Sequence, residues 1–322
     1  MASDRIRLVL SIAIAAACAG LVSCDRSTTS DSGRLPYRDA GLTIDRRVDD
    51  LLARMTAEEK FRQLFMAPGD LDRGTDGCTD GIFGLQVRAG GARSAAEKIN
   101  AIQKFFAEKT RLGIPIVPFE EALHGLVQPG ASSFPQAIGL AATWDDGLMA
   151  EVASAIAEET ATRGIRQVLS PVVNIARDVR WGRTEETYGE DPYLASRLAA
   201  AFVGGFEKRG VIATPKHFVA TVGAGGRDSY PIPDGERELR EIDFPPFLAA
   251  LREGGARSIM TSYNSWNGLP CSANPRLLTD ILKGEWAFRG FVSSDASAVG
   301  GSYSLHLTAG SYVESGRQAW SS

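Results

Sequence analysis

The sequence of 322 residues has no excess of positive charge and no nucleotide-binding motif. Lysine and arginine together number 35, against 39 aspartates and glutamates, which gives a net charge of -4. Nucleic acid is therefore not an expected partner, because binding to a phosphate backbone requires clustered cations. Neither a G-x-G-x-x-G nor a G-x-x-x-x-G-K-[ST] motif follows an expected strand, so the sequence does not predict a dinucleotide or P-loop site.

Cysteine and histidine are also scarce, with 4 and 3 copies. Cys18 and Cys24 belong to the N-terminal segment, and the remaining pair, Cys78 and Cys271, does not establish a disulfide. No two cysteines have the C-x-x-C spacing that is typical of a structural zinc site. We therefore expect neither a metal ion nor another cofactor.

Long hydrophobic runs are absent except at residues 8–22. Arg5 and Arg7 precede this run, which is shorter than the ~20 residues that span a bilayer. A positive start followed by a short apolar stretch is typical of an export signal. Residues 1–23 are thus predicted to be a signal peptide, and the protein is expected at the periplasmic or extracellular face.

The end of the signal predicts a lipid anchor. Residues 21–24, Leu-Val-Ser-Cys, resemble the lipobox of bacterial lipoproteins, which implies lipidation of Cys24 and a membrane tether. An ordinary signal peptide with an incidental cysteine is the alternative. Residues 24–40 are rich in Ser, Thr and Asp and are expected to form a linker.

From residue 41 onward, short apolar or β-branched segments alternate with segments of helical periodicity. This alternation indicates parallel strands joined by helical crossovers. About seven units predict an α/β fold over residues 41–299, a (β/α)8 TIM-like barrel that is incomplete. An open doubly wound sheet is the alternative. The expected strands are residues 64–66, 81–87, 114–119, 168–175, 211–218, 258–264 and 290–294. Helix starts are expected at Ser94, Asp191 and Asn274.

Polar side chains cluster at the ends of the expected strands. In a parallel barrel these ends form the face that carries the chemistry. Taken singly, each such residue is also explained as a helix cap or a loop hydrogen bond. Five successive strands ending in this way favour a functional face. The residues are Glu120, Glu121, His124, Asn174, Arg177, Lys216, His217, Tyr263, Asn264 and Asp295.

Five sequence blocks resemble glycoside hydrolase family 3 and occur in the order of that family. They are EALHG at 121–125, SPVVNIARDVRWGRTEETYGEDP at 170–192, KHF at 216–218, MTSYN at 260–264 and GFVSSD at 290–295. The resemblance covers about residues 41–299. It implies an exo-acting retaining β-glycosidase, of β-xylosidase or β-glucosidase type, that acts on terminal non-reducing sugars of β-linked oligosaccharides.

Retaining hydrolysis requires a carboxylate nucleophile, a second carboxylic acid and groups that hold the sugar hydroxyls. By the resemblance, Asp295 is the nucleophile and forms the covalent glycosyl-enzyme. Its position after an apolar strand suits this role, although capping of the following helix is the alternative.

The resemblance also implies that Lys216, His217 and Arg183 hold the sugar and that Tyr263 lies close to the nucleophile. Adjacent residues of a strand point to opposite faces, so Lys216 and His217 require a local bend, a cis bond or a bulge to reach one ligand. A core role for His217 and a packing role for Tyr263 are the alternatives. Arg177 and Arg180 are expected to hold their loop through ion pairs with Asp178, Glu185 or Glu186.

Glu121 bears on the choice of sugar. The family often has aspartate here in glucosidases and glutamate in xylosidases and arabinosidases. The longer side chain competes with the C6 hydroxymethyl group, and one methylene of fit is worth roughly 1–3 kcal/mol. Ala296, where glucosidases commonly have tryptophan, agrees with a pentoside. Substrate binding by Glu121 and a preference for xylosides are therefore predicted, with glucosides as the alternative.

The general acid of multidomain family members comes from a sandwich domain after the barrel, which the resemblance does not extend to. Residues 300–322 are rich in Ser and Gly, with no helical period and no expected strand. We interpret them as a non-homologous tail of a truncated chain, with a natural short form as the alternative. An inactive fragment or a non-catalytic, membrane-tethered sugar-binding protein is the alternative function. The sequence does not predict an oligomeric state.

Overall fold

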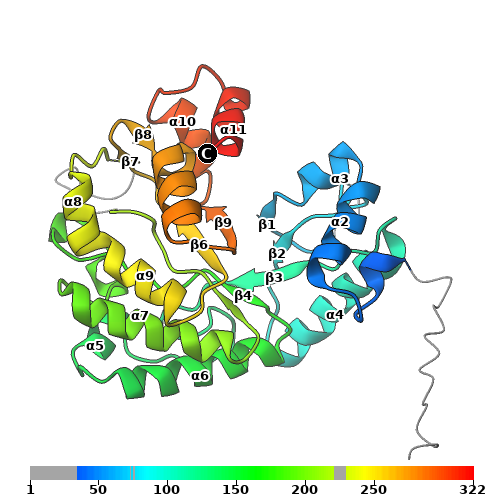
Figure 1. Cartoon of the computed structure of the whole chain (residues 1–322). Coiled ribbons are helices and arrows are strands. Elements are labelled where there is room, and N and C mark those ends of the chain that lie inside the picture. Colours follow the sequence, from blue (N-terminus) through cyan, green and yellow to red (C-terminus); the bar gives the residue numbers. More distant parts are fainter. Residues whose placement is uncertain (1–34, 73, 75–76, 221–229) are drawn as a thin grey trace, which may run out of the picture. The chain divides into compact units, whose positions relative to one another are not determined.

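The computed structural model describes residues 35–72, 74, 77–220 and 230–322 (Figure 1). The predicted signal peptide and Cys24 lie outside these residues, so export, lipidation and the tether stay predictions. Within the described part of the chain, every helix is too short or too polar to cross a membrane. The chain divides into two compact units, with the boundary between Thr56 and Ala57 in the sequence.

The smaller unit contains a short 3-10 turn, Pro36–Arg38, and helix α2, Ile44–Arg54. The Thr43 hydroxyl caps α2 by accepting a hydrogen bond from the Arg46 amide, as expected for threonine before a helix. Asp50 of α2 accepts a hydrogen bond from the Tyr37 amide at 3.1 Å, which ties the turn to the helix.

The larger unit is built on parallel strands in chain order. Its strands are β1 (Met66–Pro68), β2 (Gly84–Gln86), β3 (Val117–Glu120), β4 (Gln167–Val168), β5 (Ile212–Ala213), β6 (Ser258–Thr261) and β9 (Phe291–Ser294). The first five form one sheet, and β6 pairs with β9 in parallel. Residues 215–218 join the two sheets, because the Met260 amide donates to the Pro215 carbonyl and the Phe218 amide to the Met260 carbonyl.

The last strand lies against the first. The Ser293 hydroxyl of β9 is 3.7 Å from the Met66 sulfur of β1, and the rings of Phe83 and Phe291 meet edge to face at 5.1 Å. These side-chain contacts place β9 next to β1. The predicted α/β TIM-like barrel is confirmed as the fold class.

Helices surround these strands, with α4, α6, α7 and α9 on the outside (Figure 1). The α-helices of the larger unit are α3 (Ala57–Arg62), α4 (Ala92–Lys109), α5 (Ala137–Ala141), α6 (Asp146–Thr162), α7 (Pro192–Glu207), α8 (Glu236–Glu238), α9 (Phe244–Arg252), α10 (Ala298–Ser304) and α11 (Tyr312–Trp320). Leu239–Asp243 and Arg276–Glu285 are wound as π-helix, and Val179–Trp181, Thr184–Glu186 and Cys271–Ala273 form 3-10 turns. An antiparallel hairpin, β7 (Ser265–Trp266) and β8 (Leu269–Pro270), follows β6.

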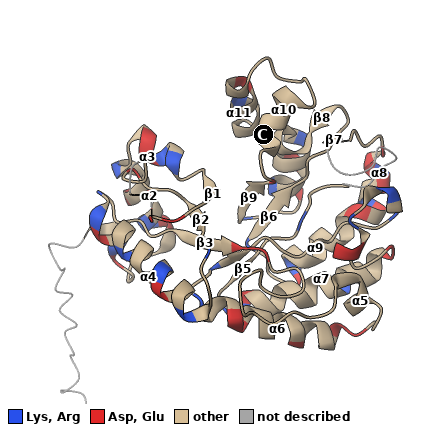
Figure 2. Ribbon diagram, turned by 180° about the vertical axis from the view of Figure 1, so that it is seen from behind, with Lys and Arg blue, Asp and Glu red and all other residues tan. Residues whose placement is uncertain are grey.

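The core lies between the strands and the outer helices. Phe202 and Phe206 of α7 stack at 4.9 Å, and Phe218 meets Phe247 of α9 edge to face at 5.1 Å. Figure 2 shows acidic and basic residues interspersed along the helices that surround the strands. The apolar faces of these helices therefore face the strands, as their predicted periodicity requires.

Three local expectations are corrected. Helix α4 begins at Ala92 rather than at Ser94, whose hydroxyl instead donates to the Gly91 carbonyl. Strands β4 and β5 are much shorter than the predicted 168–175 and 211–218, because Pro171 and Pro215 have no amide hydrogen to donate to a ladder.

The segment 300–322 also differs from the prediction, because it contains the end of α10 and the whole of α11. The Ser311 hydroxyl caps α11 by accepting a hydrogen bond from the Glu314 amide, and Gln318 donates to the Thr308 carbonyl at 3.0 Å. Capping and tertiary contacts thus form helices in a sequence of low helical periodicity. The other predicted helix starts are confirmed, since Asp191 caps α7 and Asn274 accepts a hydrogen bond from the Leu277 amide.

Candidate active site

Asp295 stands directly after β9, where the predicted nucleophile belongs. Gly290 allows β9 to approach β6, because a Cβ atom there would lie 2.1 Å from the Arg257 carbonyl oxygen. The Oδ1 atom of Asp295 accepts a hydrogen bond from the Ala296 amide at 2.7 Å. The Oδ2 atom is buried and has no hydrogen-bond partner among the described residues. A buried carboxylate oxygen without a partner is uncommon, and it marks a position that a ligand can use.

His217 faces this carboxylate, with its Nε2 atom 3.6 Å from Asp295 Oδ2. Asn174 orients the ring: its Oδ1 atom accepts a hydrogen bond from the His217 backbone amide at 2.8 Å and lies 3.0 Å from Nδ1. Because that oxygen can only accept, Nδ1 carries a hydrogen and Nε2 is the atom presented to Asp295. The peptide bond between Lys216 and His217 is cis, one of the departures from regular strand geometry that the sequence required.

Lys216 reaches Glu121 on the neighbouring part of the face. Its Nζ atom donates to both Glu121 oxygens, at 2.7 and 2.9 Å, and its side chain is 5% exposed. Glu121 itself is about one third exposed. The Glu121 side chain thus remains in part accessible to a ligand while Lys216 holds both of its oxygens.

Arg183 and Tyr263 complete the group. The guanidinium of Arg183 forms a bidentate pair with Glu186, with both N–O distances at 2.8 Å, and lies over the Trp181 ring. Tyr263 follows β6, and its hydroxyl donates a hydrogen bond to the Asp295 carboxylate. We call Glu121, Arg183, Lys216, His217, Tyr263 and Asp295 the strand-end cluster.

The electrostatics of the cluster connect its two central carboxylates. Burial raises the pKa of Asp295, and the Ala296 amide, Lys216, Tyr263 and Arg183 each oppose that rise. Burial also raises the pKa of Glu121; Lys216 opposes the rise, while the negative charge of Asp295 adds to it. Lys216 therefore favours the ionised form of both carboxylates.

Sequence reasoning missed the supporting role of Glu120. This carboxylate is 2% exposed and accepts hydrogen bonds from Gln86 at 2.5 Å and from Gln128 at 2.7 Å. It thereby links the end of β2 to the loop that follows Glu121. The position of Glu120 next to Glu121 in the sequence indicates a place near the site, but only the fold shows which side-chain amides hold its carboxylate.

The partners of Arg177 were predicted incorrectly, whereas Arg180 pairs with Asp178 as expected. Arg177 pairs with Asp234 at 2.7 Å, Glu238 at 2.6 Å and Asp243 at 3.0 Å, which lie between β5 and α9. These residues are more than fifty positions away in the sequence, so local spacing could not reveal them.

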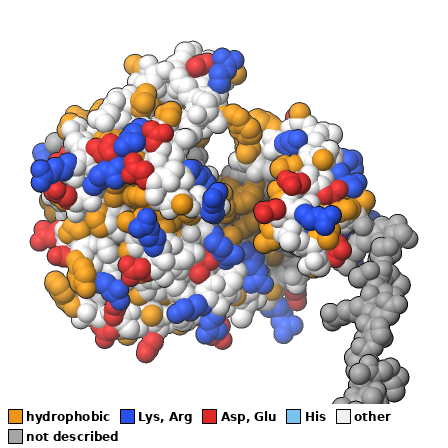
Figure 3. All heavy atoms as spheres, in the orientation of Figure 1, with side chains coloured by type: hydrophobic (Ala, Val, Ile, Leu, Met, Phe, Trp, Pro, Cys, Tyr) orange, Lys and Arg blue, Asp and Glu red, His pale blue; other side chains and the backbone are white. Residues whose placement is uncertain are grey.

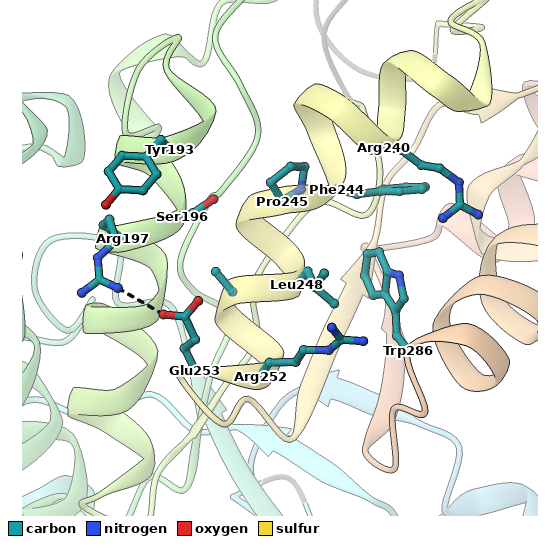
Figure 4. A pocket seen from close by; sticks show the side chains of 11 residues that line it. Tyr193, Ser196, Arg197, Arg240, Phe244, Pro245, Leu248, Arg252, Glu253 and Trp286 are labelled. Atoms are coloured by element: carbon teal, nitrogen blue, oxygen red, sulfur yellow. Dashed lines mark hydrogen bonds and ion pairs between the residues drawn. The ribbon is translucent and has the colours of Figure 1, made fainter.

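Two surface hollows lie apart from the strand-end cluster. One, of about 450 Å³, extends over α9 between Tyr193 of α7 and Trp286 (Figure 4). Its charged groups are paired in part, as in the contact of Arg197 with Glu253 at 3.1 Å, and Figure 3 shows charges of both signs grouped on this face. The other, of about 410 Å³, is formed by the loop between His124 and Ser133.

Comparison with known proteins identifies one family. The model of the glycosyl hydrolase family 3 N-terminal domain matches residues 72–321, including the segment 300–321 that was interpreted as a non-homologous tail. A β-xylosidase from Formosa agariphila is 39% identical over 68% of this chain, and a β-glucosidase from Rhizobium radiobacter is 40% identical over 58%.

Solved structures agree. A β-glucosidase from Erythrobacter marinus superposes with a TM-score of 0.82 at 34% identity, covering 88% of this chain and 40% of that one. A β-glucosidase from Listeria innocua, solved in complex with glucose, has a TM-score of 0.76 at 28% identity and covers 85% of this chain and 40% of its own. The chain spans 32% of the Formosa β-xylosidase and 24% of the Rhizobium β-glucosidase, less than two thirds of either relative.

Proposed function

The chain belongs to the family of the glycosyl hydrolase family 3 N-terminal domain, and from this premise we propose that it carries the nucleophile and sugar-binding site of an exo-acting retaining β-glycosidase. One observation carries the proposal: the buried Oδ2 atom of Asp295 has no hydrogen-bond partner among the described residues, while Oδ1 is held by the Ala296 amide. A carboxylate oxygen that is fixed in place and otherwise unused suits attack on an anomeric carbon.

In the proposed first step, Asp295 Oδ2 forms a bond to the anomeric carbon as the bond to the leaving-group oxygen breaks. An activated phenol departs as a stabilised anion, whereas a sugar leaving group takes up a proton from solvent water. Lys216, His217 and Arg183 hold the hydroxyls of the sugar, and Tyr263 keeps its hydrogen bond to the nucleophile. The oxygen of a water molecule then bonds to the anomeric carbon as the bond to Asp295 Oδ2 breaks, and the water gives up one proton to solvent. This step restores the carboxylate and retains the configuration.

Glu121 supports a preference for xylosides over glucosides within this proposal. Its carboxylate is held toward Lys216 and remains one third exposed. Its length would compete with a C6 hydroxymethyl group, which xylose does not have. Ala296 beside the nucleophile offers no aromatic surface for a larger sugar.

A 2-fluoro-β-xyloside with an activated leaving group tests the proposal directly, since the fluorine slows release of the glycosyl-enzyme more than its formation. Intact mass measurement should show one added sugar, and peptide mapping should locate it on Asp295. The 2-fluoro-β-glucoside should react more slowly. Labelling of another residue, or a faster reaction of the α-anomer, would contradict the proposed mechanism.

Sugar binding without hydrolysis is a second candidate, favoured by the state of the other carboxylates. Among the described acids around Asp295, Glu121 is paired with Lys216, Glu186 with Arg183, and Glu120 with two amides. None of them is arranged to donate a proton to a leaving group. A saturable change in tryptophan fluorescence with xylose, together with no labelling by the 2-fluoro glycosides, would favour this candidate.

A further inference from the structure

His306 lies outside the strand-end cluster but contacts Tyr263, whose hydroxyl is hydrogen-bonded to the nucleophile. His306 follows α10 and is half-buried, and its Nε2 atom lies 2.8 Å from the carbonyl oxygen of Tyr263. A carbonyl oxygen can only accept, so Nε2 must carry a hydrogen. This hydrogen bond therefore persists in both the neutral and the protonated forms of the imidazole.

The contact closes a ring of interactions around Asp295. The Ala298 amide donates to the Asp295 carbonyl at 2.9 Å, which starts α10 directly after the nucleophile. The His306 amide donates to the Gly301 carbonyl at 2.9 Å, which turns the chain back at the end of α10. His306 then holds Tyr263, and the Tyr263 hydroxyl returns to the Asp295 carboxylate.

The hydrogen-bond ladder between β6 and β9 does not extend to Tyr263 and Asp295, so other contacts must hold these two residues. Its last pair is Thr261 with Ser294, so Tyr263 and Asp295 both lie beyond it. Ser262 is anchored by its own amide, which donates to the Phe218 carbonyl at 2.8 Å. The Tyr263 carbonyl is held by His306. A shift of that peptide would move the phenol hydroxyl relative to Asp295.

We propose that His306 is a positioning residue for the nucleophile, acting through Tyr263. It holds the Tyr263 backbone so that the phenol hydroxyl stays on the Asp295 carboxylate. This inference rests on the proposed function, because it assigns His306 to the same reaction. His306 contacts a backbone carbonyl and is therefore not itself a catalytic residue.

The experiment compares four variants. His306→Leu removes the donor, whereas His306→Gln keeps an N–H that can reach the Tyr263 carbonyl. Tyr263→Phe removes the hydroxyl and sets the upper limit of the effect. Gln318→Leu is the matched control, because Gln318 of α11 donates to the carbonyl of Thr308, in the segment between α10 and α11, at 3.0 Å. If His306→Leu does not fold, His306→Asn, whose amide is too short to reach, takes its place.

The readout is the rate of labelling by the 2-fluoro xyloside as a function of pH. Attack requires ionised Asp295, so the acid limb of this profile reports the pKa of its carboxyl group. The lost hydrogen bond should move the acid limb of Tyr263→Phe and His306→Leu upward by about half to one pH unit. His306→Gln and Gln318→Leu should keep the limb of the unsubstituted protein. A lower melting temperature with an unmoved limb in His306→Leu, or an equal shift in Gln318→Leu, would overturn the proposal.

A second measurement separates failure of the inference from failure of the proposed function. If the unsubstituted protein is not labelled, the proposed function fails, and the carboxyl carbon of Asp295 can still be titrated by ¹³C NMR. Its signal is assigned by its loss in Asp295→Asn. The same order of pKa values among the variants would support the positioning role, and equal values for His306→Leu and the unsubstituted protein would reject it.

Discussion

Asp295 and Asp243 are both buried carboxylates whose pKa is raised by burial, but their surroundings differ. Asp243 is 2% exposed, and both of its oxygens accept hydrogen bonds from Arg177, at 3.0 and 3.3 Å. Asp295 has one oxygen held by a backbone amide and one with no hydrogen-bond partner among the described residues. Both oxygens of Asp243 are therefore bonded within an ion cluster, whereas Asp295 retains one oxygen that can contact a ligand.

This difference shows that a perturbed pKa does not by itself identify a catalytic carboxylate. The pKa of Asp243 rises to about 7, because burial and the nearby charges of Asp234 and Glu238 outweigh Arg177. Its cluster joins the loop after β4 to the segment before α9, which gives it a structural explanation. What distinguishes Asp295 is the unused oxygen together with His217 and Tyr263 directed at the same carboxylate.

The largest expected effect is the loss of the nucleophile. Asp295→Ala should lower the hydrolysis of an aryl β-xyloside by about 10⁴-fold or more, since the covalent step is lost. Its thermal stability should be unchanged or higher, because a buried charge is removed. Azide should restore part of the rate by occupying the space of the carboxylate, and it should yield the α-glycosyl azide. An unchanged rate of hydrolysis in Asp295→Ala would show that Asp295, like Asp243, is a buried carboxylate without a catalytic role.

The second effect concerns Asp243 and is one of stability. Its pKa in the folded state is about 7, above the ordinary value of 3.8, so between these values the folded protein binds more protons than the unfolded chain. The stability that this group contributes is therefore fully present below pH 3.8 and is lost as pH rises from there through about 7. The difference between the folded and unfolded pKa values means that Asp243 contributes at most about 4 kcal/mol to the free energy of unfolding of the protein.

Asp243→Asn should remove this dependence, while labelling at Asp295 by a 2-fluoro xyloside continues at 25 °C. Urea unfolding at pH 5, 6, 7 and 8 measures the slope of the unfolding free energy against pH for both proteins. As pH rises, the free energy of unfolding of the variant should increase relative to that of the unsubstituted protein. Parallel slopes would show that Asp243 is ionised throughout this range.

The two regions were also unequally predictable from the sequence. Most of the strand-end cluster could be predicted because its members lie at the ends of expected strands, and parallel strands bring their ends to one face. Arg183 lies between two 3-10 turns and was predicted only from the family resemblance. The Arg177 cluster could not, because its acids come from a segment whose path depends on the packing of α8 and α9. The nearer acids Asp178, Glu185 and Glu186 were equally plausible partners on spacing alone, and two of them in fact pair with other arginines.

The helices after Asp295 escaped prediction for a related reason. Helix α10 contains glycine and serine, which have low helix propensity, and it is held by contacts such as the Ser272 hydroxyl on the Ala298 carbonyl at 3.2 Å. Tertiary contacts thus outweigh helix propensity in the helix that directly precedes His306. The turn between β7 and β8, in contrast, has a local signal in Asn267-Gly268, both with positive φ.

The third effect is on the cation of the cluster. Lys216→Met leaves Glu121 without its ion pair and removes a charge that lowers the pKa of Asp295. We expect kcat/KM to fall by about 10²-fold and the acid limb of the pH profile to move upward. Lys98→Met is the matched control, because Lys98 bridges Asp70 and Asp72, both at 2.6 Å, outside the cluster. An equal loss in both variants would indicate a general effect of removing a lysine.

The smallest expected effect concerns the choice between glucosides and xylosides. Glu121→Asp shortens the side chain by one methylene and makes room for a C6 hydroxymethyl group, which should raise the glucoside-to-xyloside ratio of kcat/KM by about tenfold. The shorter carboxylate also weakens the contact with Lys216, but that loss affects both substrates and cancels in the ratio. The ratio is measured with nitrophenyl glycosides that share a leaving group. A ratio that stays constant while both rates fall would assign Glu121 to holding Lys216, and the choice of sugar would then depend on other residues.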